Sequence, residues 1–339
     1  MRCKGRNEFM ELIRIGNGVL AAAACEYGAV LQNIEYNGVR VCVGFDTLAE
    51  YERDECCFGS VVGRTANRTG EINIIDGREY RLPLNENGIN HLHGGFCGFG
   101  KKHWSVSARC GDSVSFTRVS PAGEEGYPGN LDVNVTYRVE GTALIINYRA
   151  TTDAPTWVSL TNHTYFNLAG VGTGDIYGHD VQINAESVSV YDKNNRVAGR
   201  MPVAGSEFDF RTPRTVQKDY DCNYYISAPA VMAYGRELSL AARASCGGIG
   251  LAVYTDMPCM QFYTGRYIPE GTVVSGGSKI SRGGGLCFET QLEPGFQSRG
   301  EGVLRSGEVY DRTTVFEFSR AEKLCGITVE KGAALCYNQ

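Results

Sequence analysis

His163 lies in the segment Leu160–Leu168, where threonine, asparagine and tyrosine side chains surround it. Such neighbours can fix the tautomer of an imidazole, and an imidazole titrates near neutral pH, so this histidine is a candidate for proton transfer. The same neighbours would also satisfy the hydrogen bonds of a histidine with a purely structural role in the core. The segment alone supports both interpretations.

His91 and His93 directly precede Gly94 and Gly95. On a strand the two imidazoles would share a face, which is a spacing that zinc ligands use, but the sequence offers no evident third ligand. The glycines indicate instead a backbone that closely approaches a ligand. We therefore expect His93 to contact a ligand and expect no metal, while a structural role for the pair stays open.

The candidate charged groups are Glu289, Asp221 and Arg68. Glu289 is a lone carboxylate in the apolar segment Leu286–Gln291, where burial would raise its pKa and suit it to act as a base. Asp221 lies among tyrosines, whose rings beside polar groups suit a pyranose. Each group also has a simpler interpretation, as a surface glutamate at a strand end, an Asp–Asn turn and a surface arginine.

The segments that must position these groups have the pattern of β-strands. From Leu131 to Glu140 apolar and polar residues alternate, which is typical of a half-buried strand. Asp76-Gly77 between two short apolar runs predicts a hairpin. No long amphipathic helix is evident, and residues 224–240 are the least regular. We predict an all-β fold, a large antiparallel β-sandwich that forms a single domain over residues 1–339.

Composition and charge restrict the partners and the compartment. Hydrophobic residues make up 42% of the 339 residues, and the net charge of −5 favours neither a nucleic-acid partner nor an anionic membrane. No apolar run reaches transmembrane length. The 13 cysteines include no C-x-x-C pair, which predicts reduced thiols in a cytoplasmic protein rather than a zinc ribbon or a disulfide framework.

Five segments resemble motifs of the aldose 1-epimerase (galactose mutarotase) family, in the family's order: Gly63–Arg68, Asn90–Gly95, Asn162–Leu168, Asp221–Tyr224 and Phe288–Gln291. The resemblance extends from Gly28 to Phe318 and implies a galactose mutarotase-like supersandwich. It also implies an isomerase that interconverts the α and β anomers of a free aldose such as galactose or glucose. We expect this small sugar as the partner, no cofactor, and a monomer or homodimer.

The resemblance implies roles for seven residues. Glu289 would take the proton of the anomeric hydroxyl, His163 would protonate the ring oxygen, and His93 would lie beside that oxygen. The sugar hydroxyls would be bound by Asn67, Arg68, Asp221 and Gln261. A carboxylate base and an imidazole acid suit this reaction, because opening a hemiacetal requires one proton to leave O1 and one to reach O5.

The chain departs from the family pattern at Cys222, where a histidine is usual, and after Gln291, where the segment is shorter and altered. Strand alternation predicts that Cys222 points away from the sugar if Asp221 points toward it. Two rival functions share the fold. A hexose-6-phosphate 1-epimerase would need a basic cluster beyond Lys101-Lys102, and a non-catalytic carbohydrate-binding β-sandwich protein could lack the acid or the base. A glycosidase would need two carboxylates at the scissile bond and would leave the histidines unexplained.

Overall fold

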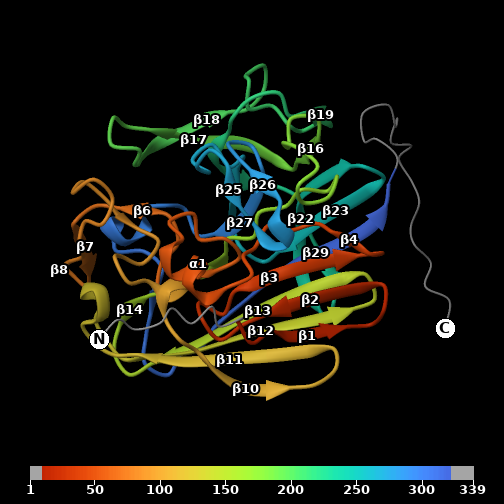
Figure 1. The fold of residues 1–339 in the computed structure, drawn as a ribbon. Helices are drawn as coiled ribbons and strands as arrows, with labels where there is room; N and C mark the ends of the chain where they lie inside the picture. Colours follow the sequence, from red (N-terminus) through yellow and green to blue (C-terminus); the bar gives the residue numbers. More distant parts are fainter. Residues whose placement is uncertain (1–9, 322–339) are drawn as a thin grey trace.

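The computed structural model describes residues 10–321, and strands form most of its regular structure (Figure 1). The predicted single domain over 1–339 therefore reaches beyond the described residues at both ends, and it stays a prediction. The described part contains one α-helix, α1 (Leu48–Arg53), which begins with a capping box between Thr47 and Glu50. Short 3₁₀ turns are η1 (Phe99–Lys101), η2 (Glu124–Gly126), η3 (Ser275–Gly277) and η4 (Phe296–Arg299).

The largest sheet has ten strands and is antiparallel throughout. The predicted strand over 131–140 is one of its central members, and its apolar residues are buried as the alternation indicates. In spatial order the strands are β10 (Ser105–Arg109), β11 (Ser113–Ser120), β12 (Leu131–Glu140), β13 (Ala143–Thr152), β29 (Tyr310–Arg320), β23 (Ile249–Thr255), β22 (Arg236–Cys246), β16 (Asp180–Ile183) and β19 (Arg214–Thr215), with β21 (Ala230–Ala233) paired to β22.

A second antiparallel sheet has five strands, and it carries much of the candidate site. In spatial order they are β18 (Val197–Pro202), β17 (Ala185–Tyr191), β20 (Asp221–Ile226), β24 (Cys259–Tyr263) and β27 (Cys287–Gln291). The chain connects β20, β24 and β27 only through long excursions, so residues far apart in sequence become neighbours across these strands.

A four-stranded sheet and five two-stranded ribbons complete the fold. The sheet consists of β1 (Ile13–Gly16), β2 (Leu20–Ala24), β3 (Leu31–Tyr36) and β4 (Val39–Arg40). The ribbons are β5 (Val61–Val62) with β15 (Thr161–Asn162), β6 (Arg68–Thr69) with β9 (His91–Leu92), β7 (Ile72–Ile75) with β8 (Arg78–Arg81), β14 (Thr156–Trp157) with β28 (Val303–Leu304), and β25 (Thr272–Val273) with β26 (Lys279–Ile280). The β7–β8 ribbon is the predicted hairpin, and Asp76 and Gly77 both have the positive φ of its turn.

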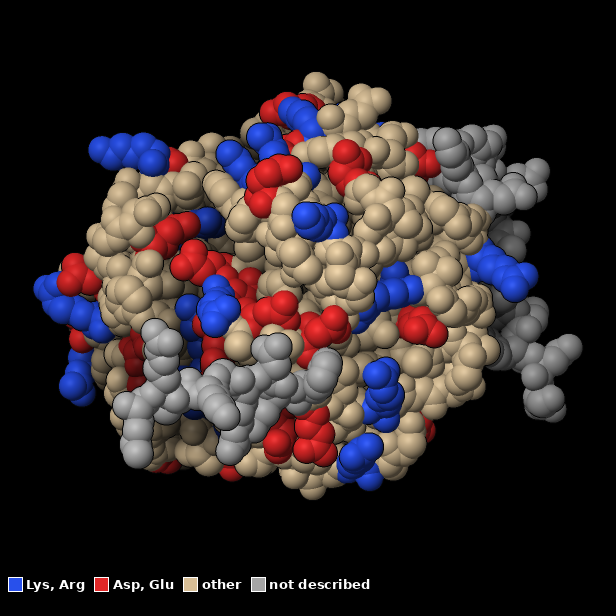
Figure 2. Space-filling model, in the orientation of Figure 1, with Lys and Arg blue, Asp and Glu red and all other residues tan. Residues whose placement is uncertain are grey.

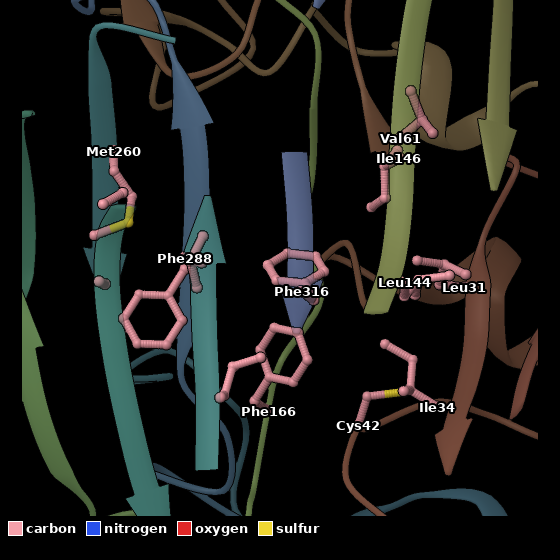
Figure 3. Packing of buried hydrophobic residues seen from close by; sticks show 14 of the residues in the cluster. Leu31, Ile34, Cys42, Val61, Leu144, Ile146, Phe166, Met260, Phe288 and Phe316 are labelled. Atoms are coloured by element: carbon pink, nitrogen blue, oxygen red, sulfur yellow. The ribbon is translucent and has the colours of Figure 1, made fainter. Parts of the chain in front are cut away.

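The core lies between the sheets. In Figure 3, Leu144 of β13 lies beside Leu31 of β3. Both belong to one buried cluster with Phe288 of β27 and Phe316 of β29. Burial of each such side chain contributes roughly 1.5–3 kcal/mol, so this cluster holds the three larger sheets together. The predicted all-β sandwich is confirmed.

Charged side chains are spread over the surface. On the face shown in Figure 2, lysine and arginine are interspersed with aspartate and glutamate rather than gathered into one basic patch. Among residues 10–321, no helix has the length and apolar character needed to cross a membrane.

Candidate active site

The base candidate Glu289 lies in the middle of β27, directly opposite Gln261 of β24, which in turn lies opposite Asn223 of β20. Successive residues of a strand point to opposite faces. Phe288 and Phe262 therefore stack on the core side with ring centroids 5.6 Å apart, and Glu289 and Gln261 point to the other face. Glu289 is only 2% exposed, so it is not the surface glutamate that its segment also allowed.

His163 directly follows β15 and faces Glu289. Its backbone is fixed on both sides, because its N–H donates to the Ser60 carbonyl at 2.9 Å and its carbonyl accepts from the Gly59 N–H at 3.0 Å. Its Nε2 lies 3.6 Å from Oε2 of Glu289, and its ring stacks on Tyr165 with centroids 4.9 Å apart. The imidazole and the carboxyl are thus close enough to act on one small molecule.

His93 joins this pair, whereas His91 does not. The strand β9 ends at Leu92, and His93 has a left-handed φ of 53°, so the two histidines do not share a strand face as the spacing suggested. The His93 ring lies 5.4 Å from that of His163. The ring nitrogens of His91 instead contact the Pro83 carbonyl at 2.8 Å and the Tyr127 hydroxyl at 2.7 Å, which gives His91 a structural role.

Asn67, Gln261 and Asp221 form a chain of hydrogen bonds beside the histidines. Asn67 Nδ2 donates to Gln261 Oε1 at 3.0 Å, and Gln261 Nε2 donates to Asp221 Oδ1 at 2.7 Å. The Asn67 backbone, with φ of 63°, also donates its N–H to Nδ1 of His93 at 3.2 Å. The structure thus brings these three sequence-predicted residues together around the histidines.

Arg68 lies at the start of β6, next in sequence to Asn67. Its guanidinium donates from Nε and Nη2 to the carboxylate of Glu86, at 2.8–3.0 Å. Burial raises the pKa of Glu86, but the hydrogen bond from Arg68 is among the causes that lower it overall. This bidentate pair fixes the direction of the arginine fork.

Burial moves the pKa values of the carboxyl and the imidazole in opposite directions. It raises the pKa of Glu289 to about 8, with a further contribution from the charge of Asp221, and it lowers the pKa of His163 to about 4. Burial also places the pKa of His93 well below its ordinary value. Near neutral pH the pair of Glu289 and His163 therefore holds one proton in total.

Donor atoms of His93, His163 and Glu289 lie within 4.8 Å of one another, a set of ligand types that divalent cations use. Their hydrogen bonding does not favour a metal, however. Because Nδ1 of His93 accepts a hydrogen bond from the Asn67 N–H, the neutral ring carries its proton on Nε2 and has no free lone pair to offer there. The expectation that no metal takes part stays a prediction.

Two residues of the site were not identified from the sequence. Glu86 stands between Asn85 and Asn87 in a polar turn, and nothing local indicates that it pairs with Arg68. Cys287, whose Sγ lies 3.5 Å from Nδ1 of His163, precedes Glu289 by two residues. Period-two alternation would have placed it on the same face as Glu289.

Cys222 points away from the site, as expected from alternation. It is 8% exposed and belongs to the buried apolar cluster, whereas its neighbour Asp221 is partly exposed and accepts from Gln261. An imidazole at position 222 would enter this core, and its N–H would have to find a new partner.

We expect Asp221→Ala to lower kcat/KM by about 10-fold to 100-fold, through loss of charge-assisted hydrogen bonds. Cys222→His is expected to lower Tm while changing KM by less than about tenfold, since it acts on the core. Polarimetric kinetics on glucose, galactose, xylose and arabinose and a thermal melt check both variants. If Cys222→His reorders the substrate preference and Asp221→Ala leaves it intact, the wrong residue has been assigned to the sugar.

The sequence of this chain is similar to those of known proteins. The family model described as aldose 1-epimerase matches residues 11–317. The chain is 41% identical over 291 residues to galactose mutarotase of Rattus norvegicus, covering 83% of this chain and 84% of that protein. It is 32% identical over 290 residues to aldose 1-epimerase of Escherichia coli strain K12, covering 79% and 82%.

Solved structures show the same fold. The aldose epimerase homologue from C. elegans matches with a TM-score of 0.84 at 27% identity, covering 92% of this chain and 100% of that one. Galactose 1-epimerase from Lactobacillus acidophilus matches with a TM-score of 0.81 at 25% identity, covering 95% and 98%.

Proposed function

This chain belongs to the aldose 1-epimerase family, and we propose that its buried pair of His163 and Glu289 carries out the family's reaction. The chain is an isomerase that interconverts the α and β anomers of free aldoses, with galactose and glucose as the proposed substrates. The observation that carries the assignment of roles is the 3.6 Å separation of His163 Nε2 and Glu289 Oε2 in a buried site.

In the proposed mechanism the single proton of the pair first moves from Glu289 to Nε2 of His163, across the 3.6 Å between them. Glu289 then takes the proton of the O1 hydroxyl while Nε2 of His163 delivers its proton to the ring oxygen O5. The C1–O5 bond breaks and leaves an open-chain aldehyde. Rotation about C1–C2 presents the other carbonyl face, and ring closure reverses both transfers, so the enzyme is regenerated with its single shared proton. His93 points its Nε2–H toward O5. This hydrogen bond stabilises the negative charge that develops on O5 as the C1–O5 bond breaks.

Four polar residues are proposed to hold the sugar during this rotation. Asp221, Gln261 and Asn67 offer a continuous row of donors and acceptors, and Arg68, oriented by Glu86, presents a fixed fork. These hydrogen bonds keep C1 of the sugar between the acid and the base. In a reaction without a cofactor, this positioning is the main way in which substrate binding lowers the barrier.

The pH dependence follows from the proton count. Below about pH 4 both groups of the pair are protonated and no base remains, and above about pH 8 both are deprotonated and no acid remains. We expect kcat/KM to be flat between these limits, where the pair holds one proton that either group can carry. It should fall at lower pH as the pair takes up a second proton, and at higher pH as the pair loses its proton. A kcat/KM that rises steadily through pH 8, after correction for the spontaneous reaction, would contradict the assignment.

The rival functions are less well supported. Beside His93 lies a cavity of about 400 Å³ that is lined by Asp54, Glu55 and Glu86 as well as Lys101, and Lys102 is already paired with Glu124 at 3.0 Å. Arg68 balances the charge of Glu86, and the remaining Asp54 and Glu55 outnumber Lys101, so the cavity lining has no excess of positive charge to hold a phosphate. A non-catalytic sugar-binding protein would have no need for a buried carboxyl with a pKa near 8.

Compartment and assembly are also proposed. Nine cysteines among the described residues, including the buried Cys25, Cys42 and Cys259, are free thiols, which supports a reducing, cytoplasmic location. All the proposed site residues come from one chain, which is compatible with the proposed monomer or homodimer.

A further inference from the structure

The two nitrogens of the His163 ring face different groups. Nε2 faces Oε2 of Glu289 at 3.6 Å, and Nδ1 faces Sγ of Cys287 at 3.5 Å. Cys287 is fully buried and lies two residues before Glu289 on the same face of β27. Tyr165 stacks on the ring with its plane tilted by only 18°, so the imidazole is held between an aromatic face, a thiol and a carboxyl.

If His163 exchanges protons with the sugar through Nε2, its Nδ1 must keep a proton and needs a hydrogen-bond acceptor. An imidazolium that gives its Nε2 proton to the sugar becomes a neutral ring that carries its remaining proton on Nδ1. That Nδ1–H needs an acceptor in a buried site, because an unpaired N–H there is costly. The sulfur of Cys287 lies within hydrogen-bond distance for this role, and burial raises the pKa of its thiol well above the ordinary value, so the sulfur is neutral.

On the basis of the proposed function, we infer that Cys287 is a positioning residue, whose sulfur accepts the Nδ1–H of His163 and leaves Nε2 as the nitrogen that exchanges protons with the sugar. A carboxylate often occupies the equivalent place beside a catalytic histidine, where its charge stabilises the imidazolium. A neutral thiol orients the ring without that charge. The imidazole therefore stays a good proton donor to a weakly basic ring oxygen.

The direct test is the tautomer of His163 in the wild-type protein, measured by long-range ¹H–¹⁵N NMR correlation at neutral pH. The ring signals are assigned by their loss in His163→Asn. We expect the Nδ1–H tautomer to predominate. Predominance of the Nε2–H tautomer would overturn the inference, whether or not any variant of Cys287 folds.

A pair of matched variants tests the consequence for catalysis. Cys287→Ala removes the acceptor, and we expect the Nε2–H tautomer to increase and kcat to fall by about threefold to tenfold with KM within about twofold, as for loss of one weak hydrogen bond. Cys42→Ala removes an equally buried thiol from the apolar core and should leave the His163 tautomer and kcat unchanged. An unchanged tautomer and kcat in Cys287→Ala contradict the inference.

The test separates this inference from the proposed function. If the wild-type protein does not accelerate mutarotation, the proposed function fails, whereas the tautomer of His163 can still be measured in the inactive protein. If the wild-type protein is active but His163 carries its proton on Nε2, the function stands and the role of Cys287 is wrong.

Discussion

Glu289→Gln is expected to lower kcat for mutarotation by at least about a hundredfold, as for the loss of a general base. The amide has nearly the shape of the carboxyl but cannot accept the O1 proton. Binding of the sugar should change less, because Asp221, Gln261 and Arg68 remain in place. Polarimetry on freshly dissolved α-D-galactose measures the change, and the exposed Glu237→Gln on β22 serves as the matched control.

The same variant should not cost stability. The unfolded chain ionises this carboxyl near its ordinary pKa, whereas the folded chain keeps the proton to about pH 8. The wild-type free energy of unfolding therefore decreases as pH rises through this window. Glutamine does not titrate, so at pH 8 the Tm of Glu289→Gln should equal or exceed that of the wild type. A variant with near-wild-type mutarotation would show that Glu289 is not the base.

His163→Asn is expected to lower kcat by at least about a hundredfold, since no other imidazole among residues 10–321 forms this 3.6 Å contact with Glu289. Asparagine can hydrogen-bond to the ring oxygen but cannot deliver a proton to it. His93 cannot replace the lost acid, because its Nδ1 accepts the Asn67 N–H, and a neutral ring that gave up its Nε2 proton would be left as an imidazolate.

The control for this variant is His103→Asn, which replaces an exposed histidine outside the site. It should leave kcat and KM unchanged in the same polarimetric assay. Circular dichroism and the thermal melt establish that His163→Asn is folded. Retention of most of the wild-type rate by a folded His163→Asn would assign the acid role to another group.

Local pattern was sufficient to predict those elements whose exposure alternates. β12 could be located because each apolar residue from Leu131 to Val139 is buried, and the β7–β8 hairpin because Asp76-Gly77 supports a tight turn. Residues 224–240 had no clear pattern because β20 ends there, and β21, at the edge of its sheet, leaves Val231 and Met232 exposed.

The arrangement of the site could be predicted only in part. Family motifs indicated which side chains gather, but no local signal places Glu86 against Arg68, since that contact depends on how the β6–β9 ribbon folds back. The sequence also did not predict that His93 lies in the site while His91 points elsewhere. It results from the early end of β9 and a left-handed residue that is not glycine, a conformation that sequence rarely signals.

The central claim is that this chain catalyses anomer interconversion, and polarimetry on the wild-type protein tests it most directly. The rotation of freshly dissolved α-D-galactose should relax to the ordinary equilibrium value, with a rate constant that increases in proportion to enzyme concentration above the spontaneous rate. A catalyst changes the rate and not the final rotation. Relaxation at the spontaneous rate at every enzyme concentration, with both galactose and glucose, would contradict the claim.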